Sequence, residues 1–596
     1  MADVAWIIER LKAMSAPEVA WRISQKVIQK KEQYKYQSSK IAVTNTLFDQ
    51  KLKKLRLDAS KMGLNYRNLV FSTNTSIPML GGYDYETYKK DWHAGFQTKN
   101  KWPDEFSYFL KYKQRDHIGD ARTNWELNRH FQFTLLAKNY FTSNDSQYLD
   151  EFLELFEDWN DKNPFLWGIS WTSVMEIGIR CSNWCYSYCF LAETKAPEPL
   201  LNKLRIGILN MTDYIVKHYS RYSSANNHLI VEAYAVGQTG ILFDYKPWID
   251  FAVHILTREL SLQNYSDGIN KELSLHYQSF YMEAMGLMMR LMKVNGMAVP
   301  DTWSPMVTKM CRYVSDCIGK HGEVVAFGDN DEGKILDLCG GLDHYQYVLG
   351  LFSCLLPERY VDHLDCENLQ WLFEKKILDE TPQKDRYTPP LCACYKEGGN
   401  TILRSRDGRV LIGIDHGALG FGSIAAHGHA DALSFQMFVD GQPVLADPGT
   451  YLYHCDLERR NNFRKTENHN TVCVNGKDQS EMLGAFLWGR KAECKLLEWA
   501  ETENSFFLKA VVNDLHIREF VFDFQNHLTI KDQVLQEADG EINFILGSNS
   551  NAVTISGSYE RKTVEISAFY GKKETAVKLS HKFKHSLRTE IVVWEE

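Results

Sequence analysis

The densest cluster of polar side chains in the second half of the chain is His427-Gly-His429-Ala-Asp431. On a β-strand, residues at i, i+2 and i+4 project from one face, so both imidazoles and the carboxylate would point the same way. An unpaired polar group on a buried sheet face costs about 1–3 kcal/mol. With Asp447 and His469 downstream, two histidines and one aspartate could bind Zn²⁺ and leave one histidine for proton transfer. A hydrogen-bonded structural network explains the spacing equally well.

Asn226, Asn227 and His228 precede an apolar segment, LIVEAYAVGQTGILF, that is expected to be a helix. The N–H groups and dipole of a helix N-terminus suit a carboxylate, and the side chains of Asn227 and His228 would add donors. Plain N-capping by an asparagine is the simpler interpretation, and the pattern alone favours it.

Two other clusters contain acids or bases. Tyr277 lies in a polar stretch, 272–278, where a helix is expected to begin. It could be a proton donor, although the pattern alone favours a buried structural residue. The segment 327–333, FGDNDEG, is acidic. Its length does not fit an EF-hand, so turn formation is favoured over cation binding.

Several functions are excluded. The chain has no Walker loop, Gly-rich dinucleotide motif or Gly-x-Ser-x-Gly elbow, which argues against ATPase, NAD-dependent and α/β-hydrolase activities. A net charge of −8 argues against general nucleic-acid binding. No stretch approaches the roughly 20 apolar residues of a membrane span. The 13 cysteines lack zinc-ribbon spacing, and Cys181, Cys185 and Cys189 predict a buried helix face.

The apolar period is helical up to about residue 380 and changes after it. Tyr148, Leu149, Phe152, Leu155, Phe156 and Trp159 form one stripe, and short polar links between such segments predict antiparallel helix hairpins. Beyond about residue 385, short β-branched or aromatic-rich segments are separated by Asp-Gly and Asn-Gly turns, which is typical of an antiparallel β-sandwich. We expect domains at 1–385 and 386–596. Within the first, residues 1–60 would form a Lys-rich helical arm that could be loosely attached, although a solvated helix face explains the lysines as well, and 61–385 the main helical domain.

Seven segments, taken in order, resemble the heparinase II/III-like polysaccharide lyases over most of the chain. They are Trp125-Glu126-Leu127-Asn128-Arg129-His130; Asn163-Pro164 with Gly168, Trp171, Ser173, Met175, Glu176 and Arg180; Asn226-Asn227-His228; Glu272-x-Ser274-x-x-Tyr277; Gly328-Asp329; His427-Gly-His429-Ala-Asp431; and Asp447-Pro-Gly449-Thr450 followed by Arg464-x-Thr466-x-x-His469-Asn470. The resemblance implies an α+β multidomain fold, with an N-terminal incomplete (α/α) toroid followed by a C-terminal antiparallel β-sandwich.

The resemblance also implies β-elimination of a uronic-acid glycosaminoglycan, closest to heparan sulfate or heparin. Asn227 and His228 would engage the substrate carboxylate. Tyr277 would act as base, acid or both, and His427 as its partner base. Arginines in the matched motifs, Arg129, Arg180 or Arg464, could lower the pKa of Tyr277. The implied substrate-binding residues are Asn226, Glu126, Arg129, Trp171, Arg464, Tyr451 and Tyr453, of which either of the last two could be a second catalytic tyrosine.

By the same resemblance, His429, Asp447 and His469 match structural zinc ligands, and calcium is associated with some members instead. Relatives commonly have Tyr-His where this chain has Tyr277-Gln278, with His276 before the tyrosine. The expected partner is an acidic polysaccharide, and the chain would be a monomer or homodimer. The family implies a periplasmic or secreted protein. The first 27 residues read as an amphipathic helix without secretory-signal features, so a cytoplasmic location is the alternative.

Other interpretations stay open. Lyases of the same type act on chondroitin, hyaluronan, alginate or bacterial exopolysaccharides. A toroid glycoside hydrolase would need two carboxylates about 5–10 Å apart, with Asp329, Asp331 and Glu332 as candidates. A glycan-binding protein without activity is a third class. A sulfated substrate requires basic residues, and a solvated loop explains the nearby cluster equally well: Arg459, Arg460, Arg464 and Lys465.

Overall fold

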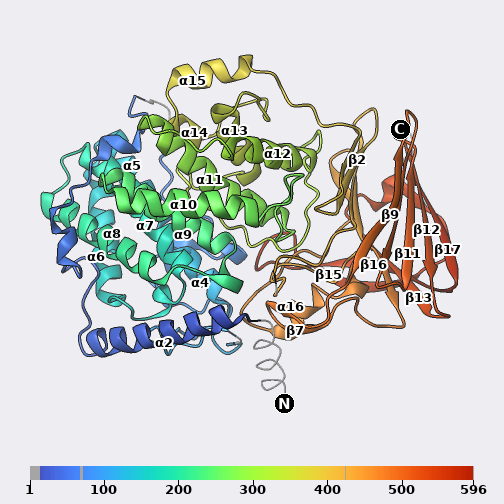
Figure 1. The fold of residues 1–596 in the computed structure, drawn as a ribbon, viewed down its shortest axis with the longest axis horizontal. Helices are drawn as coiled ribbons and strands as arrows, with labels where there is room; N and C mark the ends of the chain where they lie inside the picture. The colour runs from blue at the N-terminus through green and yellow to red at the C-terminus, as the bar shows by residue number, and fades with distance from the viewer. Residues whose placement is uncertain (1–13, 68–71, 114, 423, 595–596) are drawn as a thin grey trace.

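The first half of the chain is an incomplete ring of paired helices (Figure 1). The computed structural model describes residues 14–67, 72–113, 115–422 and 424–594. The long helices are α5 (Phe131–Ser143), α6 (Ser146–Lys162), α7 (Val174–Ala192), α8 (Glu198–His218), α9 (Asn227–Leu242), α10 (Lys246–Leu262), α11 (Leu275–Val294), α12 (Trp303–Asp316) and α13 (His344–Leu355). The shorter ones are α3 (Tyr85–Tyr88), α4 (Ala121–Asn128), α14 (Glu367–Leu372) and α15 (Lys375–Glu380).

The ring has an inner and an outer row. The inner helices α5, α7, α9, α11 and α13 contact one another in sequence order, and α6, α8, α10 and α12 pack against them from outside. Inner helices are buried nearly all round, as α9 and α11 show, which explains their continuous apolar sequences. An outer helix such as α6 buries one face: the predicted stripe from Leu149 to Trp159 together with Asn160, while Tyr148 is only partly buried. Each consecutive pair is thus an α-hairpin with one enclosed member.

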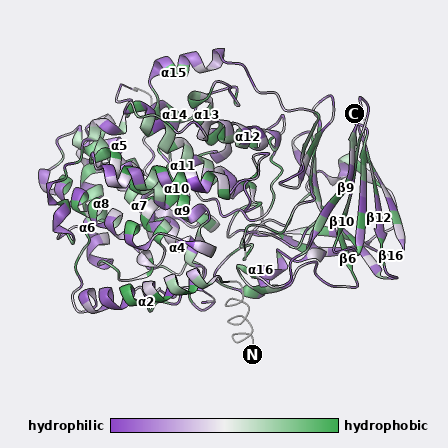
Figure 2. Cartoon of the chain, in the orientation of Figure 1, coloured by the Kyte–Doolittle hydropathy of each residue, from purple (hydrophilic) through white to green (hydrophobic). Residues whose placement is uncertain are grey.

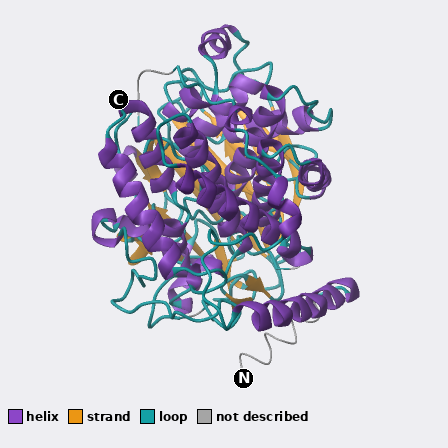
Figure 3. Ribbon diagram, turned by 90° about the vertical axis from the view of Figure 1, so that its left-hand side faces the viewer, coloured by secondary structure: helices purple, strands orange, loops and turns teal. Residues whose placement is uncertain are grey.

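The N-terminal segment is attached more firmly than expected. Helix α2 (Ala16–Tyr36) begins at the cap Ser15 and lies along the edge of the ring (Figure 3). From Tyr36 onward the chain enters the main helical core, where Val43, Leu47 and Leu52 are buried. The idea of a loose arm is therefore wrong for residues 36–60, although their lysines do face solvent. The part of the expected N-terminal helix at residues 1–13 lies outside the described residues.

The second half is an antiparallel β-sandwich. One sheet has the order β1-β2-β3-β4-β5-β13-β16-β15 with β6 beside β13, and the other β14-β17-β12-β11-β10-β9. The strands of the first are β1 (Cys392–Tyr395), β2 (Asn400–Arg404), β3 (Val410–Asp415), β4 (Phe435–Val439), β5 (Gln442–Leu445), β6 (Val472–Val474), β13 (Asp539–Leu546), β15 (Glu560–Ile566) and β16 (Glu574–Lys584). Those of the second are β9 (Cys494–Glu501), β10 (Phe506–Val512), β11 (His516–Phe522), β12 (His527–Val534), β14 (Val553–Ile555) and β17 (Ser586–Val593).

The two sheets share one apolar core. Along β10 and β11 buried and partly exposed residues alternate, and hydrophobic and hydrophilic bands alternate along the strands in Figure 2. Phe435 of the first sheet meets Phe520 of the second with ring centroids 5.6 Å apart. The helices end at Gln383 and the first strand begins at Cys392. The predicted α+β architecture, a helical toroid followed by an antiparallel sandwich, is confirmed.

Asp120, the N-cap of α4, joins the two domains. Its carboxylate accepts hydrogen bonds from the backbone N–H groups of Tyr453 (2.6 Å) and His454 (3.2 Å), and from the Tyr570 hydroxyl (2.7 Å). All three donors belong to the sandwich. The start of α4 is thereby fixed to two separate sandwich loops.

The cysteines do not form a disulfide framework. Cys181, Cys185 and Cys189 are buried on α7, as predicted, and all 13 cysteines are free. Among the residues that the structure describes, no helix is both long and apolar enough to cross a membrane.

Candidate active site

A cavity of 290 Å³ lies where the toroid meets the sandwich. We call it the cleft. Most of its walls come from segments that the sequence had singled out. Its lining includes Tyr112, Lys113, Arg122, Trp125, Thr172, Glu176, Ser220, Asn226, His228, Tyr277, Asp331, His427, Tyr453, His454 and Phe486.

Tyr277 and His427 form the centre of the cleft wall. Their rings stack with centroids 3.9 Å apart and an interplanar angle of 30°. Tyr277 stands in the first turn of α11, where its backbone N–H donates to the cap residue Ser274. Its hydroxyl lies 3.0 Å from that of Tyr453. Burial, then the nearby carboxylates of Asp331 and Asp329, raise the pKa of Tyr277 well above its ordinary value, so the phenol is protonated.

The start of α9 also lines the cleft, and Glu272 lies between it and His427. Asn226 is the N-cap and accepts from the backbone N–H of His228 (3.2 Å). Both residues line the cleft, whereas Asn227 lies buried behind them. The side-chain nitrogen of Asn227 is 2.9 Å from each carboxylate oxygen of Glu272, and its backbone N–H donates to the same group. Burial lowers the pKa of His228 to about 4, so its imidazole is neutral near pH 7.

His427 and His429 lie in the connection between β3 and β4, not on a strand. The expectation that a strand aligns them is therefore wrong. They are aligned by one carboxylate: Asp329 Oδ2 is 3.2 Å from His427 Nδ1, and Asp329 Oδ1 is 3.0 Å from His429 Nε2. Glu272 Oε2 lies 3.6 Å from His427 Nε2.

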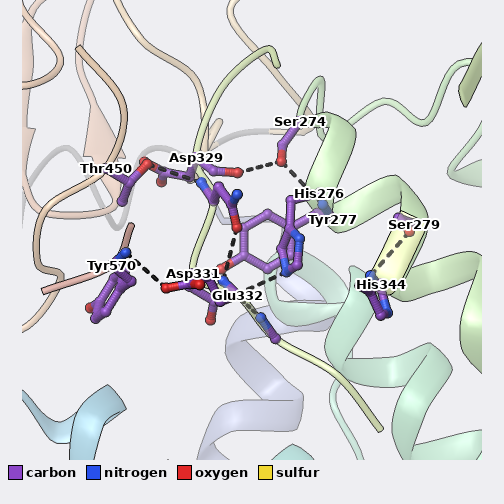
Figure 4. A network of polar contacts seen from close by, with 12 residues as sticks. Ser274, His276, Tyr277, Ser279, Asp329, Asp331, Glu332, His344, Thr450 and Tyr570 are labelled. Carbon is purple, nitrogen blue, oxygen red and sulfur yellow. Dashed lines mark hydrogen bonds and ion pairs between the residues drawn. The ribbon is translucent and has the colours of Figure 1, made fainter. Parts of the chain in front are cut away.

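Asp329 sits in the acidic loop 327–333, which passes between the two domains. Gly328 permits the passage: it has φ +62°, and a Cβ there would lie 2.7 Å from the Leu273 carbonyl oxygen and 2.9 Å from that of His427. Figure 4 shows the loop held from both sides. On the toroid side Ser274 donates to the Asp329 carbonyl (2.5 Å), and on the sandwich side Tyr570 N–H donates to Glu332 (2.9 Å).

Arg460 neutralises Asp329. Its two terminal nitrogens each lie 2.5 Å from one oxygen of the carboxylate, and both side chains are fully buried. Burial opposes ionisation of Asp329, but Arg460 and the two imidazoles hold its pKa well below the ordinary range. Sequence reasoning placed Arg460 in a basic cluster without a role, because its partner lies 131 residues away.

A second buried charge network supports the toroid wall. Arg122 donates to Asp331 (2.7 Å) and to Glu126 (2.8 Å), and Arg129 binds Glu176 through two nitrogens (2.7 and 2.8 Å). Glu126 and Arg129, predicted to bind substrate, lie behind the wall that Arg122 and Glu176 face. His276, the unusual histidine before Tyr277, lies 3.5 Å from Asp331.

The geometry of His429 and His469 suits a metal ion. His429 Nδ1 and His469 Nε2 face each other at 3.2 Å. Each imidazole has its other nitrogen directed to an acceptor: His469 Nδ1 donates to the Lys465 carbonyl oxygen (2.9 Å), and His429 Nε2 faces ionised Asp329. The two facing nitrogens therefore present lone pairs to each other. Two Zn–N bonds of about 2.0–2.1 Å at a tetrahedral angle place nitrogens roughly 3.4 Å apart.

Carboxylates complete this donor set. Asp447 Oδ2 lies 3.8 Å from His469 Nε2. Asp431, which the metal assignment had left out, offers an oxygen within 4.8 Å of a nitrogen of both imidazoles. Two imidazoles and two carboxylates match the N/O ligands of Zn²⁺, whereas Ca²⁺ takes six to eight oxygens. These residues fit zinc better than calcium.

Several predicted substrate-binding residues do not line the cleft. Trp171 and Arg464 are almost fully buried, Arg464 lying 4.8 Å from the Trp488 ring and donating to the Gly484 carbonyl oxygen. Tyr451 stacks on Phe463 outside the cleft. Trp125, quoted in a motif but not assigned a role, is the tryptophan that reaches the cleft.

The basic cluster at 459–465 is not a surface patch. Arg460 and Arg464 are buried. Arg459 pairs with Asp456 at 3.2 Å and Lys465 with Glu467 at 2.5 Å. Among the described residues that line the cleft, the cationic side chains are Arg122, which is paired, and Lys113, which is exposed at the mouth. The cluster at 459–465 therefore gives little support to electrostatic attraction of a polyanionic substrate.

A helical toroid joined to an antiparallel sandwich, with a polar cleft between them, defines the class of protein. Residues 29–335 match the heparinase II/III N-terminus and residues 389–580 the heparinase II/III-like C-terminal domain. The chain belongs to the heparinase II/III family, as the motifs indicated.

Individual relatives are distant. The chain is 22% identical over 460 residues to a heparin-sulfate lyase of Bacteroides stercoris, an alignment that covers 72% of this chain and 64% of the relative. The chain thus spans a little under two thirds of that protein's length. A crystal structure of heparinase III shares the fold with TM-score 0.67 and 16% identity, covering 91% of this chain and 88% of the other. A heparan sulfate lyase mutant from Pedobacter heparinus has TM-score 0.57 and 16% identity, covering 90% and 87%.

Proposed function

We propose that the chain is a polysaccharide lyase that cleaves a uronic-acid-containing glycosaminoglycan, heparan sulfate or heparin, by β-elimination. Family membership and the names of the relatives support the class of reaction and the substrate. The observation that carries the proposal is the stacking of Tyr277 on His427 at 3.9 Å in a cleft that the start of α9 also lines. Two groups able to transfer protons therefore face a site suited to a carboxylate.

The chemistry requires help from the protein because the C5 proton of a uronate is weakly acidic. Its carboxylate is already negative, so donors must offset that charge while the proton leaves. We place the carboxylate at the start of α9, where Asn226 and His228 line the cleft. Asn227 lies behind them, and its hydrogen bonds to Glu272 hold the first turn of α9 in place.

We assign the acid and base from hydrogen bonding and burial. Asp329 lies against His427 Nδ1. Nε2 lies 3.6 Å from Glu272, beyond hydrogen-bond distance, and is the nitrogen that accepts the C5 proton. The electrons of the C5–H bond form the C4–C5 double bond, and the C4–O4 bond breaks. Tyr277, protonated because burial raises its pKa, gives its proton to the departing 4-oxygen. One product fragment has a new reducing end, whose hydroxyl is the former glycosidic oxygen, and the other begins with a 4,5-unsaturated uronate.

We also propose that His429, His469, Asp447 and Asp431 hold a structural Zn²⁺ ion. Bound there, the ion would supply charge neutralisation and cross-linking and not a reaction step. Its protein ligands would fix the segment that carries His427, two residues from His429. Calcium is the alternative ion that the donor set favours less.

The glycoside hydrolase alternative has less support. A hydrolase needs one carboxylic acid with a raised pKa and a second free carboxylate. Asp329 has both oxygens bound by Arg460, and Asp331 is paired with Arg122. Arg122 and His276 hold the pKa of Asp331 well below its ordinary value despite burial. Burial raises the pKa of Glu332, but neither Asp329 nor Asp331 is left as the free second carboxylate.

The test is an ultraviolet absorbance assay on heparan sulfate, heparin, chondroitin sulfates, hyaluronan and alginate. A lyase produces a double bond conjugated to the carboxylate, so absorbance rises with each cleavage. Heparan sulfate or heparin is expected to give the fastest rise. New reducing ends without a rise in absorbance would exclude β-elimination, and a faster rise with another polymer would overturn the substrate assignment.

A further inference from the structure

Asp329 connects the two functional clusters of the molecule. Its Oδ2 contacts His427 Nδ1 (3.2 Å) in the cleft, and its Oδ1 contacts His429 Nε2 (3.0 Å) in the candidate metal site. The two oxygens belong to one rigid, planar group, so a rotation that improves one contact disturbs the other. The orientation of each imidazole is therefore tied to that of its neighbour.

Two further side chains hold the carboxylate, and one backbone hydrogen bond holds the main chain of Asp329. Arg460 binds both oxygens, and the Thr450 hydroxyl donates to Oδ1 at 3.2 Å. The Asp329 backbone N–H donates to the His427 carbonyl oxygen at 3.0 Å. With no exposed surface on the side chain, Asp329 has no alternative partner in water. A movement of one imidazole therefore changes the contact of Asp329 with the other.

The same residue also contacts the helix that carries the proposed acid. The Ser274 hydroxyl donates to the Asp329 carbonyl oxygen (2.5 Å) and accepts from the Tyr277 backbone N–H (3.1 Å). Tyr277, His427 and His429 thus share one point of attachment. Two of the three come from the sandwich and one from the toroid.

We propose that Asp329 is a positioning residue that makes the candidate metal site and the proposed catalytic pair one mechanical unit. The inference rests on the proposed function for the role of His427 and Tyr277. It goes further by requiring that loss of one carboxylate weakens metal binding and turnover together. If the carboxylate served only as a counter-charge for Arg460, its loss would change neither the orientation of His427 nor metal binding.

The experiment compares Asp329→Asn with a matched control. Asp316 is also buried, and it accepts from the hydroxyls of Tyr387 (3.1 Å) and Tyr395 (2.6 Å), which line neither the cleft nor the candidate metal site. Asp329→Asn and Asp316→Asn both keep size and replace a buried carboxyl group. We expect Asp329→Asn to lower kcat and zinc affinity each by about 10–100-fold with KM changed less than about threefold. Asp316→Asn should lower thermal stability and leave both quantities within twofold.

A second pair of variants guards against misfolding. Arg460→Lys keeps the charge but loses the two-point hold on Asp329. Arg290→Lys is its control, because Arg290 is buried in the toroid and donates to the carbonyl oxygens of Leu372 and Met62 (2.6 Å each). Arg460→Lys is expected to lower zinc affinity and kcat in parallel, and Arg290→Lys to lower neither. A variant at either position that loses turnover while keeping wild-type zinc affinity, or the reverse, would overturn the coupling.

Two readouts do not depend on lyase activity. Zinc affinity is measured by competition with a chromogenic chelator, and a crystal structure of Asp329→Asn shows the orientation of His427. If the wild type yields no unsaturated product, the proposed function fails, and these two measurements still decide whether Asp329 holds both imidazoles. A wild-type chain that binds no zinc, or a variant with both imidazoles unmoved, would refute the inference alone.

Discussion

The hydroxyl oxygens of Tyr277 and Tyr453 lie 3.0 Å apart across the boundary between toroid and sandwich. Each tyrosine is buried, and burial raises the pKa of both well above the ordinary value. Arg460 lies 4.9 Å from the centre of the Tyr453 ring. When Tyr277 gives up its proton, the Tyr453 hydroxyl can therefore donate a hydrogen bond to the negatively charged oxygen that remains. The ring of Tyr453 is itself adjacent to the positive charge of Arg460.

Tyr277→Phe is expected to reduce kcat by about 10²–10⁴-fold, the usual contribution of a general acid or base, while substrate binding is largely kept. The absorbance assay gives kcat, and equilibrium binding of an oligosaccharide gives the affinity. Tyr281→Phe is the control because Tyr281 is on the same helix, one turn further, and does not line the cleft. Equal turnover in wild type and Tyr277→Phe would contradict the mechanism.

Tyr453→Phe is expected to cause a smaller loss, on the order of tenfold in kcat, because it removes one hydrogen bond to the acid and leaves the acid in place. The measurement is the same assay at saturating substrate. A loss as large as that of Tyr277→Phe would show that Tyr453 itself transfers the proton.

Asp431→Asn tests the proposed fourth zinc ligand. We expect zinc affinity to fall by at least tenfold and the thermal midpoint in the presence of zinc to fall with it, because one oxygen donor to the ion loses its charge. Calcium should not restore the midpoint of chelator-treated protein. Restoration by calcium and not by zinc would reverse the assignment of the ion.

Glu232 makes the stability of the toroid depend on pH. This buried side chain of α9 accepts from the backbone N–H and hydroxyl of Ser220, and burial raises its pKa from 4.5 to about 8. The folded protein therefore holds a proton that the unfolded chain releases, so this group's contribution is full below about pH 4.5 and is lost as pH rises to 8. The loss is on the order of 4 kcal/mol.

Glu232→Gln removes this dependence because an amide does not ionise. Relative to the variant, the wild type should become steadily less stable between pH 5 and pH 8, measured by denaturant unfolding at each pH. A difference between the two proteins that stays constant over this range would show that Glu232 is ionised throughout.

Arg122→Met is expected to cost about 3–5 kcal/mol of unfolding free energy, because it leaves the buried carboxylates of Asp331 and Glu126 without their shared cation. Lys246→Met breaks an exposed pair with Asp250 on α10 and is expected to cost no more than about 1 kcal/mol. Chemical denaturation of both variants checks the contrast, which similar losses would contradict.

The sequence predicts the elements better than the contacts between them. Helical period finds the stripe that α6 buries, because a stripe is a local property of one helix. Period 2 does not find the arrangement of His427 and His429, since they lie in a loop and are aligned by Asp329, almost 100 positions earlier. The spacing of the two histidines correctly indicated a polar cluster, but the strand that was expected to align them is absent.

Residue type alone also could not separate close neighbours. Arg460 and Arg464 are both buried arginines, one turn of helix apart in sequence, yet the first binds Asp329 and the second contacts Trp488 and Gly484. Trp171 and Trp125 pose the same problem, because only the second reaches the cleft. Such distinctions depend on how the two domains dock. Contacts between domains produce no periodic pattern in the sequence of either domain, so periodicity cannot predict them.

The contacts of Asp120 have a consequence for how such proteins can evolve. This toroid carboxylate is matched to three donors in two sandwich loops, around Tyr453 and Tyr570. Recombination that exchanges whole domains between relatives would keep each core intact and still separate this carboxylate from its donors. Toroid and sandwich are therefore expected to be inherited as a pair, with substitutions at the junction accepted only when both sides change together.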